Sequence, residues 1–400
     1  YYGPERTKDP KVLSDQDVVV TTYSVLSSDY GVSMSESPLH KVKWLRVVLD
    51  EGHTIRNPNA QQTQAVLSLE AQRRWILTGT PIQNSLKDLW SLICFLKLKP
   101  FTDREWWHRT IQRPVTTGED GGLCLFFLSR LQALIKNITL RRTKTSKIRG
   151  RPVLDLPERK VFIQHVELSE EERQIYESLK NEGKAVISRY VSEGTILSHY
   201  ADVLAVLVRL RQLCCHPFLV SSALSSITTT ELAPPLILLA NFTASKSLFY
   251  ILFQINALMH ALVDQRRKDA TVKSIVVSQF TSFLSVIEVA LRESGFMFTR
   301  LDGSMTQKKR TEAIQSFQRP DAQSPTIMLL SLKAGGVGLN LTAASRVFLM
   351  DPAWNPAAEE QCFDRCHRLG QTKKVIVTKF VVRNSVEENM LKIQSKKREL

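Results

Sequence analysis

The first part of the chain alternates short apolar runs with segments whose apolar residues recur at helical spacing. This alternation is typical of parallel α/β folds, in which buried strands are joined by helices. We expect buried strands in residues 17–22, 45–49 and 75–78, and helices near residues 61–70, 86–98 and 128–138.

The later part of the chain repeats this alternation after a long helical stretch. Residues 169–212 have an amphipathic helical pattern that opens with Ser169-x-x-Glu172, a capping box at a helix N-terminus. From about residue 256 onward, short β-branched or apolar runs are separated by helical segments. These runs predict a second parallel sheet, with strands in residues 274–278, 326–330, 346–350 and 375–381.

Composition indicates a globular protein with a cationic surface. Four hundred residues, of which 43% are hydrophobic, are enough for two or three domains with their own cores. The 54 Lys and Arg residues exceed the 39 Asp and Glu residues, which gives a net charge of +15. Such an excess suits a polyanion such as nucleic acid, although ribosome or membrane-surface binding would give the same sum.

The six cysteines favour a reducing compartment, because they form no disulfide framework in a chain of this length. Cys362 and Cys366 stand one helical turn apart and are followed by His367. No second pair lies at the spacing of a zinc site. We therefore expect these cysteines to pack in a core, and we expect no cysteine-ligated metal.

An acidic pair, Asp50 and Glu51, directly follows the apolar run of residues 44–49. Ligands of open α/β sheets lie at the carboxyl ends of the strands, where acidic residues often hold Mg²⁺ against nucleotide phosphates. Taken alone, however, an acidic pair after a strand is more often a solvated turn than a metal site.

A second element far downstream reverses that balance. Arg365 and Arg368 lie within residues 361–371, and their i, i+3 spacing predicts that they share one helical face. Carboxylates for a metal and arginines for phosphate charge are the two halves of a phosphoryl-transfer site. We expect the two α/β lobes to bring these halves together in a cleft.

Residues 141–151 contain six cations and no acid. Such a run fits a solvated surface and a phosphate-contacting segment equally well.

Residues 220–255 are the anomalous part of the chain. They are Ser/Thr-rich and then apolar, but polar residues at 241–247 interrupt the apolar stretch where a membrane span could least tolerate them. We therefore expect no transmembrane helix and no membrane partner. Because the chain opens at Tyr1 without a methionine, we also expect it to be part of a longer protein.

At this point four motifs resemble those of the Swi/Snf-type superfamily-two DNA-dependent ATPases. They are Asp50-Glu-Gly-His53, residues 77–84 (Leu-Thr-Gly-Thr-Pro-Ile-Gln-Asn), residues 330–341 and residues 361–371. The resemblance covers nearly the whole chain apart from residues 220–255. It implies two RecA-like parallel-sheet lobes with a helical insertion between them.

The resemblance assigns catalytic roles that the chemistry supports. Asp50 would hold Mg²⁺ through water, and Glu51 would orient or deprotonate the water that attacks ATP. Arg365 and Arg368 would stabilise charge on the γ-phosphate. The nucleotide site would further include the residues His53, Gly79, Thr80, Gly336, Gly338 and Gln361. The glycines of residues 335–338 lack dinucleotide-loop spacing and fit a close backbone approach instead.

The resemblance also implies a track for double-stranded DNA, forked or associated with chromatin. Contacts along such a track position the duplex backbone without reading its sequence. The family positions that match are Thr21, Thr22, Asp302, Gly303, Ser304 and Lys333, to which the basic run adds Arg141, Arg142 and Lys144. This implies a nuclear ATP-dependent translocase that acts in chromatin and replication-fork remodelling, DNA repair and transcription regulation.

The chain also departs from the family pattern. Its phosphate-binding loop, G-x4-G-K-[ST], occurs nowhere in the 400 residues, so half of the expected ATP site is missing. A RING finger, which one branch of the family carries between its lobes, needs eight Cys or His ligands, and residues 220–255 contain none. A catalytically inactive DNA- or chromatin-binding fragment therefore stays open as an alternative.

The expected domains follow from these motifs. They are the C-terminal part of the first ATPase lobe (1–145), a basic helical segment between lobes (146–219), a divergent linker (220–255), the second lobe (256–385) and a basic C-terminal helix (386–400).

Overall fold

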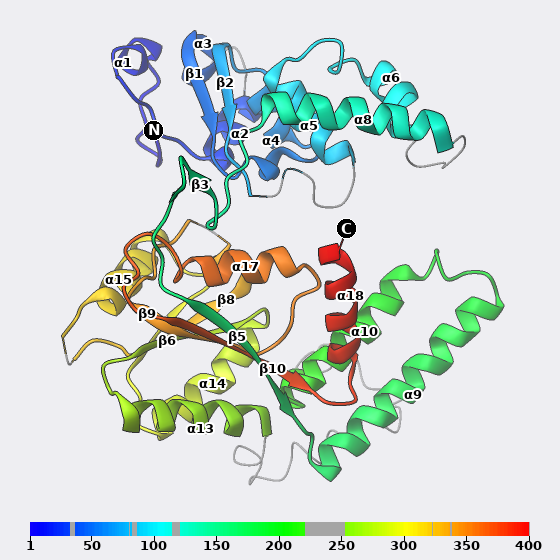
Figure 1. Cartoon of the computed structure of the whole chain (residues 1–400), viewed down its shortest axis with the longest axis vertical. Helices are drawn as coiled ribbons and strands as arrows, with labels where there is room; N and C mark the ends of the chain where they lie inside the picture. Colours follow the sequence, from blue (N-terminus) through cyan, green and yellow to red (C-terminus); the bar gives the residue numbers. More distant parts are fainter. Residues whose placement is uncertain are drawn as a thin grey trace. The chain divides into compact units, whose positions relative to one another are not determined.

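The computed structural model describes residues 1–32, 37–79, 81, 86–113, 121–220, 253–321, 323–336 and 338–399. They form two compact units, unit 1 (residues 1–143) and unit 2 (residues 144–400), shown as a ribbon in Figure 1. Most of the anomalous stretch, residues 221–252, lies outside the described residues. No helix in the described part of the chain is long and apolar enough to cross a membrane.

Unit 1 is built on two parallel strands, β1 (Trp44–Leu49) and β2 (Ala71–Ile76), which pair from Trp44 opposite Ala71 to Leu49 opposite Ile76. The expected helix between them is confirmed as α4 (Gln61–Leu67). The other helices are α1 (Pro10–Ser14), α2 (Tyr23–Val32), α3 (Pro38–Lys41), η1 (Gly52–Ile55), α5 (Leu86–Leu96), α6 (Arg104–Trp107), η2 (His108–Gln112) and α8 (Gly121–Ile138).

The prediction of a buried strand in residues 17–22 is wrong. The segment forms no regular element and pairs with no strand in the described part of unit 1, and Val18 and Val20 are 78% and 75% exposed. β-Branched residues favour extended backbone, yet a strand also needs a ladder partner, which local sequence does not supply. The expectation of full burial also fails for β1 and β2, since Leu45, Val48 and Trp75 are at least half exposed.

Unit 2 contains a six-stranded parallel sheet in the order β5-β10-β9-β6-β8-β7. The four expected strands are confirmed as β6 (Lys273–Ser278), β8 (Ile327–Ser331), β9 (Ala344–Leu349) and β10 (Val375–Val382). The sequence did not predict β5 (Arg159–Val166) and β7 (Phe298–Leu301). Both are edge strands with mostly exposed or half-buried side chains, so neither has the continuous apolar run of a central strand.

Helices cover both faces of this sheet, as Figure 1 shows. Alternate residues of β6 face opposite cores, because side chains alternate along a strand. Val276 packs with residues of α13 (Phe253–Lys268) and α14 (Thr281–Glu293). Ile275 and Val277 pack with residues of α15 (Gln307–Gln318), α16 (Leu332–Gly335) and α17 (Pro356–Asp364). The fold is therefore α/β with a parallel sheet between helical layers, as the sequence predicted.

The helical stretch between β5 and the other strands of the sheet includes α9 (Glu170–Ser192) and α10 (Tyr200–Cys215). The predicted capping box is confirmed, because Ser169 Oγ accepts from the N–H of Glu172 and the Glu172 carboxylate accepts from the N–H of Ser169. The remaining elements of unit 2 are a short hairpin of β3 (Lys147–Ile148) and β4 (Arg151–Pro152), and the C-terminal helix α18 (Val386–Glu399).

Candidate functional site

The acidic pair lies in a tight turn at the carboxyl end of β1. The N–H of Gly52 donates to the carbonyl of Leu77 at 2.9 Å, which ties the turn to the end of β2. A Cβ atom at Gly52 would stand 2.3 Å from Cγ2 of Ile76, so this close approach requires glycine. Glu51 takes the left-handed conformation, at φ 48° and ψ 50°. A non-glycine residue rarely adopts this conformation, and the tertiary contacts of the turn hold it there.

The groups around the pair define its electrostatics. The hydroxyl of Tyr23 donates to the backbone carbonyl of Asp50 at 2.8 Å. Burial raises the pKa of Tyr23 well above its usual value, and the nearby carboxylates of Asp50 and Glu51 raise it further. Glu51 Oε2 lies 3.4 Å from Nδ1 of His53. The Asp50 side chain is exposed, whereas Glu51 and His53 are partly buried.

This arrangement suits Mg²⁺ better than a metal held by protein ligands alone. Among the described residues, no group of three or more His, Cys, Asp or Glu side chains could enclose an ion. Mg²⁺ keeps several of its waters and commonly takes only one or two carboxylates together with substrate phosphates. Asp50 and Glu51 offer that number of carboxylates at a solvent-accessible strand end.

The turn shares a cavity with two residues of the expected DNA track. Asp50, Thr21 and Thr22 all line a cavity of about 780 Å³ between β1 and residues 16–23. The Thr22 hydroxyl accepts from the N–H of Val25 and so caps the start of α2. The Thr21 hydroxyl is buried and has no hydrogen-bond partner in the described part of the chain. Gly79 is exposed after β2, and Thr80 lies outside the described residues.

In unit 2 the two arginines do not share a helical face, so that prediction is wrong. Helix α17 ends at Asp364, Arg365 is its C-cap residue, and Arg368 lies in the turn beyond it. The last turn tightens because the N–H of Arg365 donates to the carbonyl of Cys362, three residues back. The buried amide of Gln371 then fixes the turn by donating to the carbonyls of Cys366, Thr342 and Ala344.

Both guanidinium groups instead donate to backbone carbonyls at and just after the end of α16. Arg365 donates to the carbonyls of Gly335 and Gly336, each at 3.0 Å. Arg368 donates to the carbonyl of Leu339 at 2.9 Å. The tertiary fold therefore brings the two arginines together by a route that the helical period did not predict.

The close backbone approach predicted for residues 335–338 occurs at Gly335. A Cβ atom there would stand 2.8 Å from Sγ of Cys362. Gly336 is half-buried, with Gln361 Oε1 3.9 Å from where its Cβ would lie, and Gly338 is exposed with nothing near it. The sequence predicted this approach for the glycines of residues 335–338 as a group. It could not indicate which glycine is in close contact, because the constraint comes from Cys362 on another element.

The expected core role of the cysteines is confirmed. Cys362 and Cys366 are buried in the core beneath α17. Burial raises the pKa of the Cys362 thiol to about 12, so this thiol stays protonated at neutral pH.

The sequence analysis missed a clamp on the arginine-bearing segment. Lys144 Nζ donates to Asp364 Oδ1 and to the carbonyl of His367, each at 2.5 Å. Arg159 reaches the same carboxylate at 3.3 Å, and it also binds Glu360 at 2.7 Å. His367 Nε2 lies 2.7 Å from the carbonyl oxygen of Pro157. The only sequence signal was the isolated Lys144 within the basic run, which we assigned to DNA.

The remaining residues of the expected DNA track differ in burial and in whether their side chains hold the local structure together. Asp302 is buried, and although burial by itself raises its pKa, hydrogen bonds from Ser304 and the Arg300 guanidinium lower it below its usual value. Its carboxylate therefore organises the loop, while Gly303 and Ser304 remain exposed. The other exposed residues of the track are Lys333 on α16 and Arg141 and Arg142 after α8.

Two family models match the chain. The SNF2-related domain matches residues 1–219, and the helicase conserved C-terminal domain matches residues 254–370. The chain therefore belongs to the SNF2-related family of helicase-like ATPases.

The chain is 58% identical over its whole length to the human helicase-like transcription factor and to the mouse protein of the same name. It is 36% identical to the DNA repair protein RAD5B of Arabidopsis thaliana. It spans 47% of the human protein and 38% of RAD5B, and thus about half or less of these relatives. A solved structure, the Sulfolobus solfataricus SWI2/SNF2 ATPase core in complex with dsDNA, is similar to this chain. The match covers 97% of this chain and 72% of that one, with 26% sequence identity and a TM-score of 0.46.

Proposed function

We propose that this chain is the motor part of an ATP-dependent double-stranded DNA translocase of the SNF2 type. The observation that carries the proposal is the Asp50–Glu51 turn, which is locked against β2 through Gly52. Backbone strain held in place by tertiary contacts is typical of sites where a side chain must be aimed. An acidic pair held in this way at a strand end is suited to phosphoryl transfer.

The carboxylates divide the chemistry between them. Asp50, which is exposed, would hold Mg²⁺ through water, and the ion would neutralise charge on the phosphates of ATP. Glu51, next to His53, would orient the attacking water and accept its proton. His53, Gly79 and Thr80 would also belong to the nucleotide site.

The arginines would act on developing charge. Arg365 and Arg368 now donate to backbone carbonyls of residues 335–339. Phosphate oxygens carry more negative charge than these carbonyls and form stronger, charge-assisted bonds with guanidinium groups. An exchange of carbonyl for phosphate partners would therefore favour the transition state. Gly336 and Gly338 belong to this stretch, and Gln361 lies beside Gly336. All three would support the exchange.

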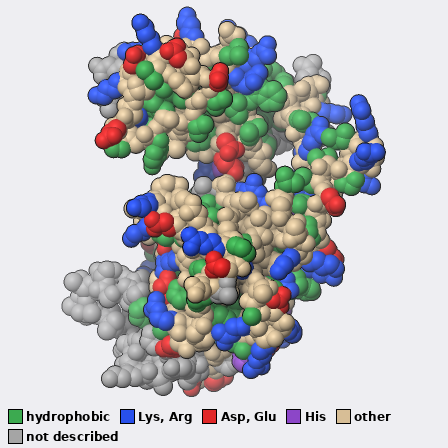
Figure 2. All heavy atoms as spheres, turned by 90° about the vertical axis from the view of Figure 1, so that its left-hand side faces the viewer, with side chains coloured by type: hydrophobic (Ala, Val, Ile, Leu, Met, Phe, Trp, Pro, Cys, Tyr) green, Lys and Arg blue, Asp and Glu red, His purple; other side chains and the backbone are tan. Residues whose placement is uncertain are grey.

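The duplex would bind through its backbone. The net charge of +15 and the exposed Arg141, Arg142 and Lys333 support electrostatic binding that is independent of sequence. Figure 2 shows Lys and Arg side chains spread over one face of the molecule, with fewer Asp and Glu side chains among them. We propose that the protein acts in the nucleus, in chromatin and replication-fork remodelling, DNA repair and transcription regulation. The names of two relatives, a helicase-like transcription factor and a DNA repair protein, support the last two of these roles.

A second candidate is a DNA- or chromatin-binding chain without ATPase activity. It rests on one observation, the absence of G-x4-G-K-[ST] from these 400 residues. Loop amides and the lysine of that motif supply much of the affinity for phosphates. In either case we assign residues 1–145 to the first lobe, 146–219 to the segment between lobes and 256–385 to the second lobe. Residues 220–255 would be a linker and 386–400 a basic helix.

Phosphate release with and without duplex DNA decides between the two candidates. The chain as it stands and the chain extended by an upstream segment that carries a P-loop are compared. DNA-stimulated release from the extended protein alone supports the translocase. If the extended protein also fails to release phosphate while still binding DNA, the second candidate is correct.

A further inference from the structure

The structure divides the six cations of residues 141–151 into three groups. Arg141 and Arg142 belong to unit 1. Lys144 donates hydrogen bonds to the carboxylate of Asp364 and to the carbonyl of His367. The last three cations, Lys147, Arg149 and Arg151, lie on the β3–β4 hairpin.

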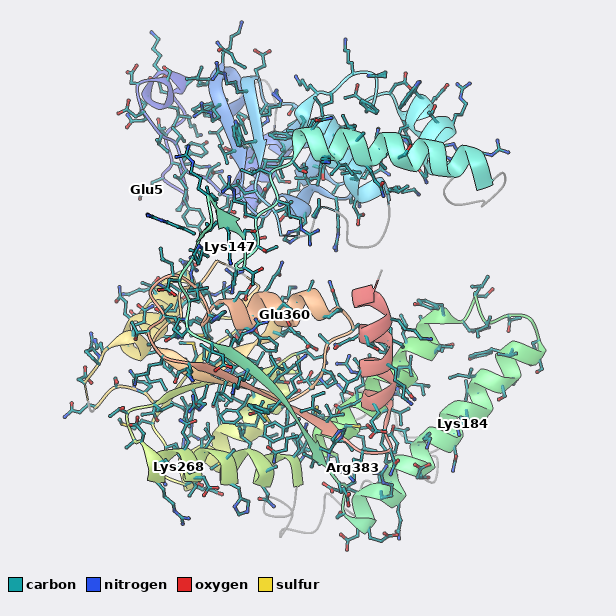
Figure 3. The ribbon with its side chains drawn as sticks, viewed as in Figure 1. Glu5, Lys147, Lys184, Lys268, Glu360 and Arg383 are labelled. Atoms are coloured by element: carbon teal, nitrogen blue, oxygen red, sulfur yellow. The ribbon has the colours of Figure 1, made fainter. Side chains whose placement is uncertain are left out.

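The hairpin has a defined geometry. Lys147 pairs with Pro152, and Ile148 pairs with Arg151. The two residues between the strands, Arg149 and Gly150, have φ angles of 50° and 78°. Left-handed conformations at both central positions are those of a type I′ turn, whose twist matches that of the paired strands. All six residues from 147 to 152 are exposed, and Lys147 is labelled in Figure 3.

The base of the hairpin is clamped at one point. Lys144, which precedes the hairpin, donates to the carbonyl of His367, and the ring of His367 lies 2.7 Å from the carbonyl oxygen of Pro157, which follows it. Both ends of residues 144–157 therefore meet on a single residue, next to Arg368. An isolated two-stranded hairpin is marginally stable in water. The clamp reduces the conformational freedom that such a hairpin would lose on binding a partner.

We propose that this hairpin binds the phosphate backbone of duplex DNA through Lys147, Arg149 and Arg151. The proposal rests on the proposed function, since duplex DNA is the partner, and it names an element that the comparisons do not. No acid occurs between residues 144 and 154, so nothing within the hairpin neutralises its three cations. A two-stranded ribbon also has dimensions that a DNA groove admits. Arg and Lys on an ordered backbone suit phosphates at fixed spacing better than a flexible acidic peptide.

The test is the salt dependence of binding to a fluorescein-labelled duplex of mixed sequence. The variant Lys147→Gln, Arg149→Asn, Arg151→Gln removes the three charges and keeps the turn, because Asn-Gly is a preferred type I′ pair. Each lost phosphate contact lowers the slope of log K against log salt by about 0.9, so the variant should lose roughly 2 to 3 units of slope. Its affinity in low salt should fall by about tenfold or more.

A matched control removes the same charge elsewhere in unit 2. Lys184, Arg267 and Lys268 are exposed, and Lys184 and Lys268 are labelled in Figure 3. Their combined change to Gln should leave the slope within about one unit of the native value. An equal loss of slope in hairpin and control variants would overturn the proposal, because net charge alone would explain the result.

The clamp provides a second, independent readout. Lys144→Gln should weaken binding by loosening the hairpin while the three phosphate contacts, and hence the slope, persist. A slope that falls in this variant as it does for a lost contact would overturn the assignment of Lys144 to the clamp.

The same titrations separate the hairpin from the proposed function. No binding of duplex by the native chain would overturn both. Native binding with an unchanged slope in the hairpin variant would overturn only the hairpin. Polyglutamate is also added as a competitor. If it displaces the duplex from the native chain more strongly than from the hairpin variant, while the slope of log K against log salt is the same for both proteins, an acidic peptide is the partner and the proposal is wrong.

Discussion

The ammonium group of Lys144 and the carboxylate of Asp364 form an ion pair at 2.5 Å, although 220 residues separate them in the chain. The pair fixes the first residue of unit 2 to the residue that precedes Arg365. The segment that leaves unit 1 is thus held next to the arginines on which the proposed chemistry depends.

This ion pair should contribute measurably to the stability of unit 2. Both side chains are about one-third to two-fifths exposed, so solvent screening limits the coupling to about 0.5–1 kcal/mol. The measurement is a double-mutant cycle of Lys144→Met and Asp364→Asn by urea unfolding. Arg109 and Glu105, a well-exposed helical pair, serve as the control and should couple by less than about 0.5 kcal/mol. Equal coupling in the two pairs would contradict the clamp.

Glu51→Gln should abolish ATP hydrolysis in the extended protein that carries a P-loop, while ATP binding persists. The substitution removes the proton acceptor for water but leaves the phosphate contacts in place. Fluorescent ATP binding and DNA-stimulated phosphate release measure the two effects separately. Loss of binding together with hydrolysis would instead indicate a role in holding the nucleotide. The 400-residue chain itself should show severely reduced ATP affinity and turnover.

Arg368→Ala should act mainly on kcat, with KM for ATP changed far less, because the phosphate charge that it would meet develops in the transition state. The loss should reach about 10³-fold or more if the residue acts as arginine fingers do elsewhere. Leu369→Ala, a change at the exposed neighbouring side chain, is the control and should leave kcat within about twofold. A rise in KM at constant kcat would show that Arg368 binds the ground state only.

Gly52→Ala should destabilise unit 1. The new methyl group would stand 2.3 Å from Cγ2 of Ile76, and overpacking of this kind costs about 1–3 kcal/mol. Gly79→Ala should be nearly neutral, because the described residues other than its chain neighbours place no atom within 4 Å of the added carbon. Urea unfolding measures both. If Ile76→Ala restores stability to Gly52→Ala, the clash itself is the cause.

Glu387 should make the stability of unit 2 depend on pH. The pKa of its carboxyl group is raised to about 8, mainly by burial. The hydrogen bond from the N–H of Val382 opposes this rise, and the nearby Asp351 adds to it. Between the usual value of 4.5 and about 8, the folded chain holds a proton that the unfolded chain has lost. Stability therefore falls as pH rises through this window and then levels off.

Glu387→Gln should remove that fall, because the amide stays neutral at every pH. The free energy of unfolding is measured by urea on both sides of the window. Glu388→Gln, at the half-buried neighbouring position, should retain the native pH dependence. A native chain whose stability rises from pH 5 to pH 8 through this group would contradict the raised pKa.

Several features could be predicted from the sequence because neighbouring residues decide them. The capping box needs only Ser169 and Glu172 three positions apart, and both hydrogen bonds form. The central strands of unit 2 can be predicted from continuous apolar runs, because both faces of such strands are buried. The position of the acidic pair after β1 could likewise be predicted, since the pair directly follows an apolar run, but its function became visible only together with the downstream arginines.

The tertiary structure decided what depends on distant partners. The left-handed backbone of Glu51 depends on the hydrogen bond from the N–H of Gly52 to the carbonyl of Leu77. The position of Arg368 beyond the end of α17 depends on the hydrogen bonds of the Gln371 amide. Residues 17–22 have strand-forming side chains but find no ladder partner among the described residues, whereas the edge strand β5 pairs with β10 despite its exposure. In the sequence Lys144 is one cation of a charge run, whereas in the folded chain it forms an ion pair with Asp364. Local sequence sets the intrinsic preference of each segment, but contacts between residues far apart in the chain determine which preference the folded protein satisfies.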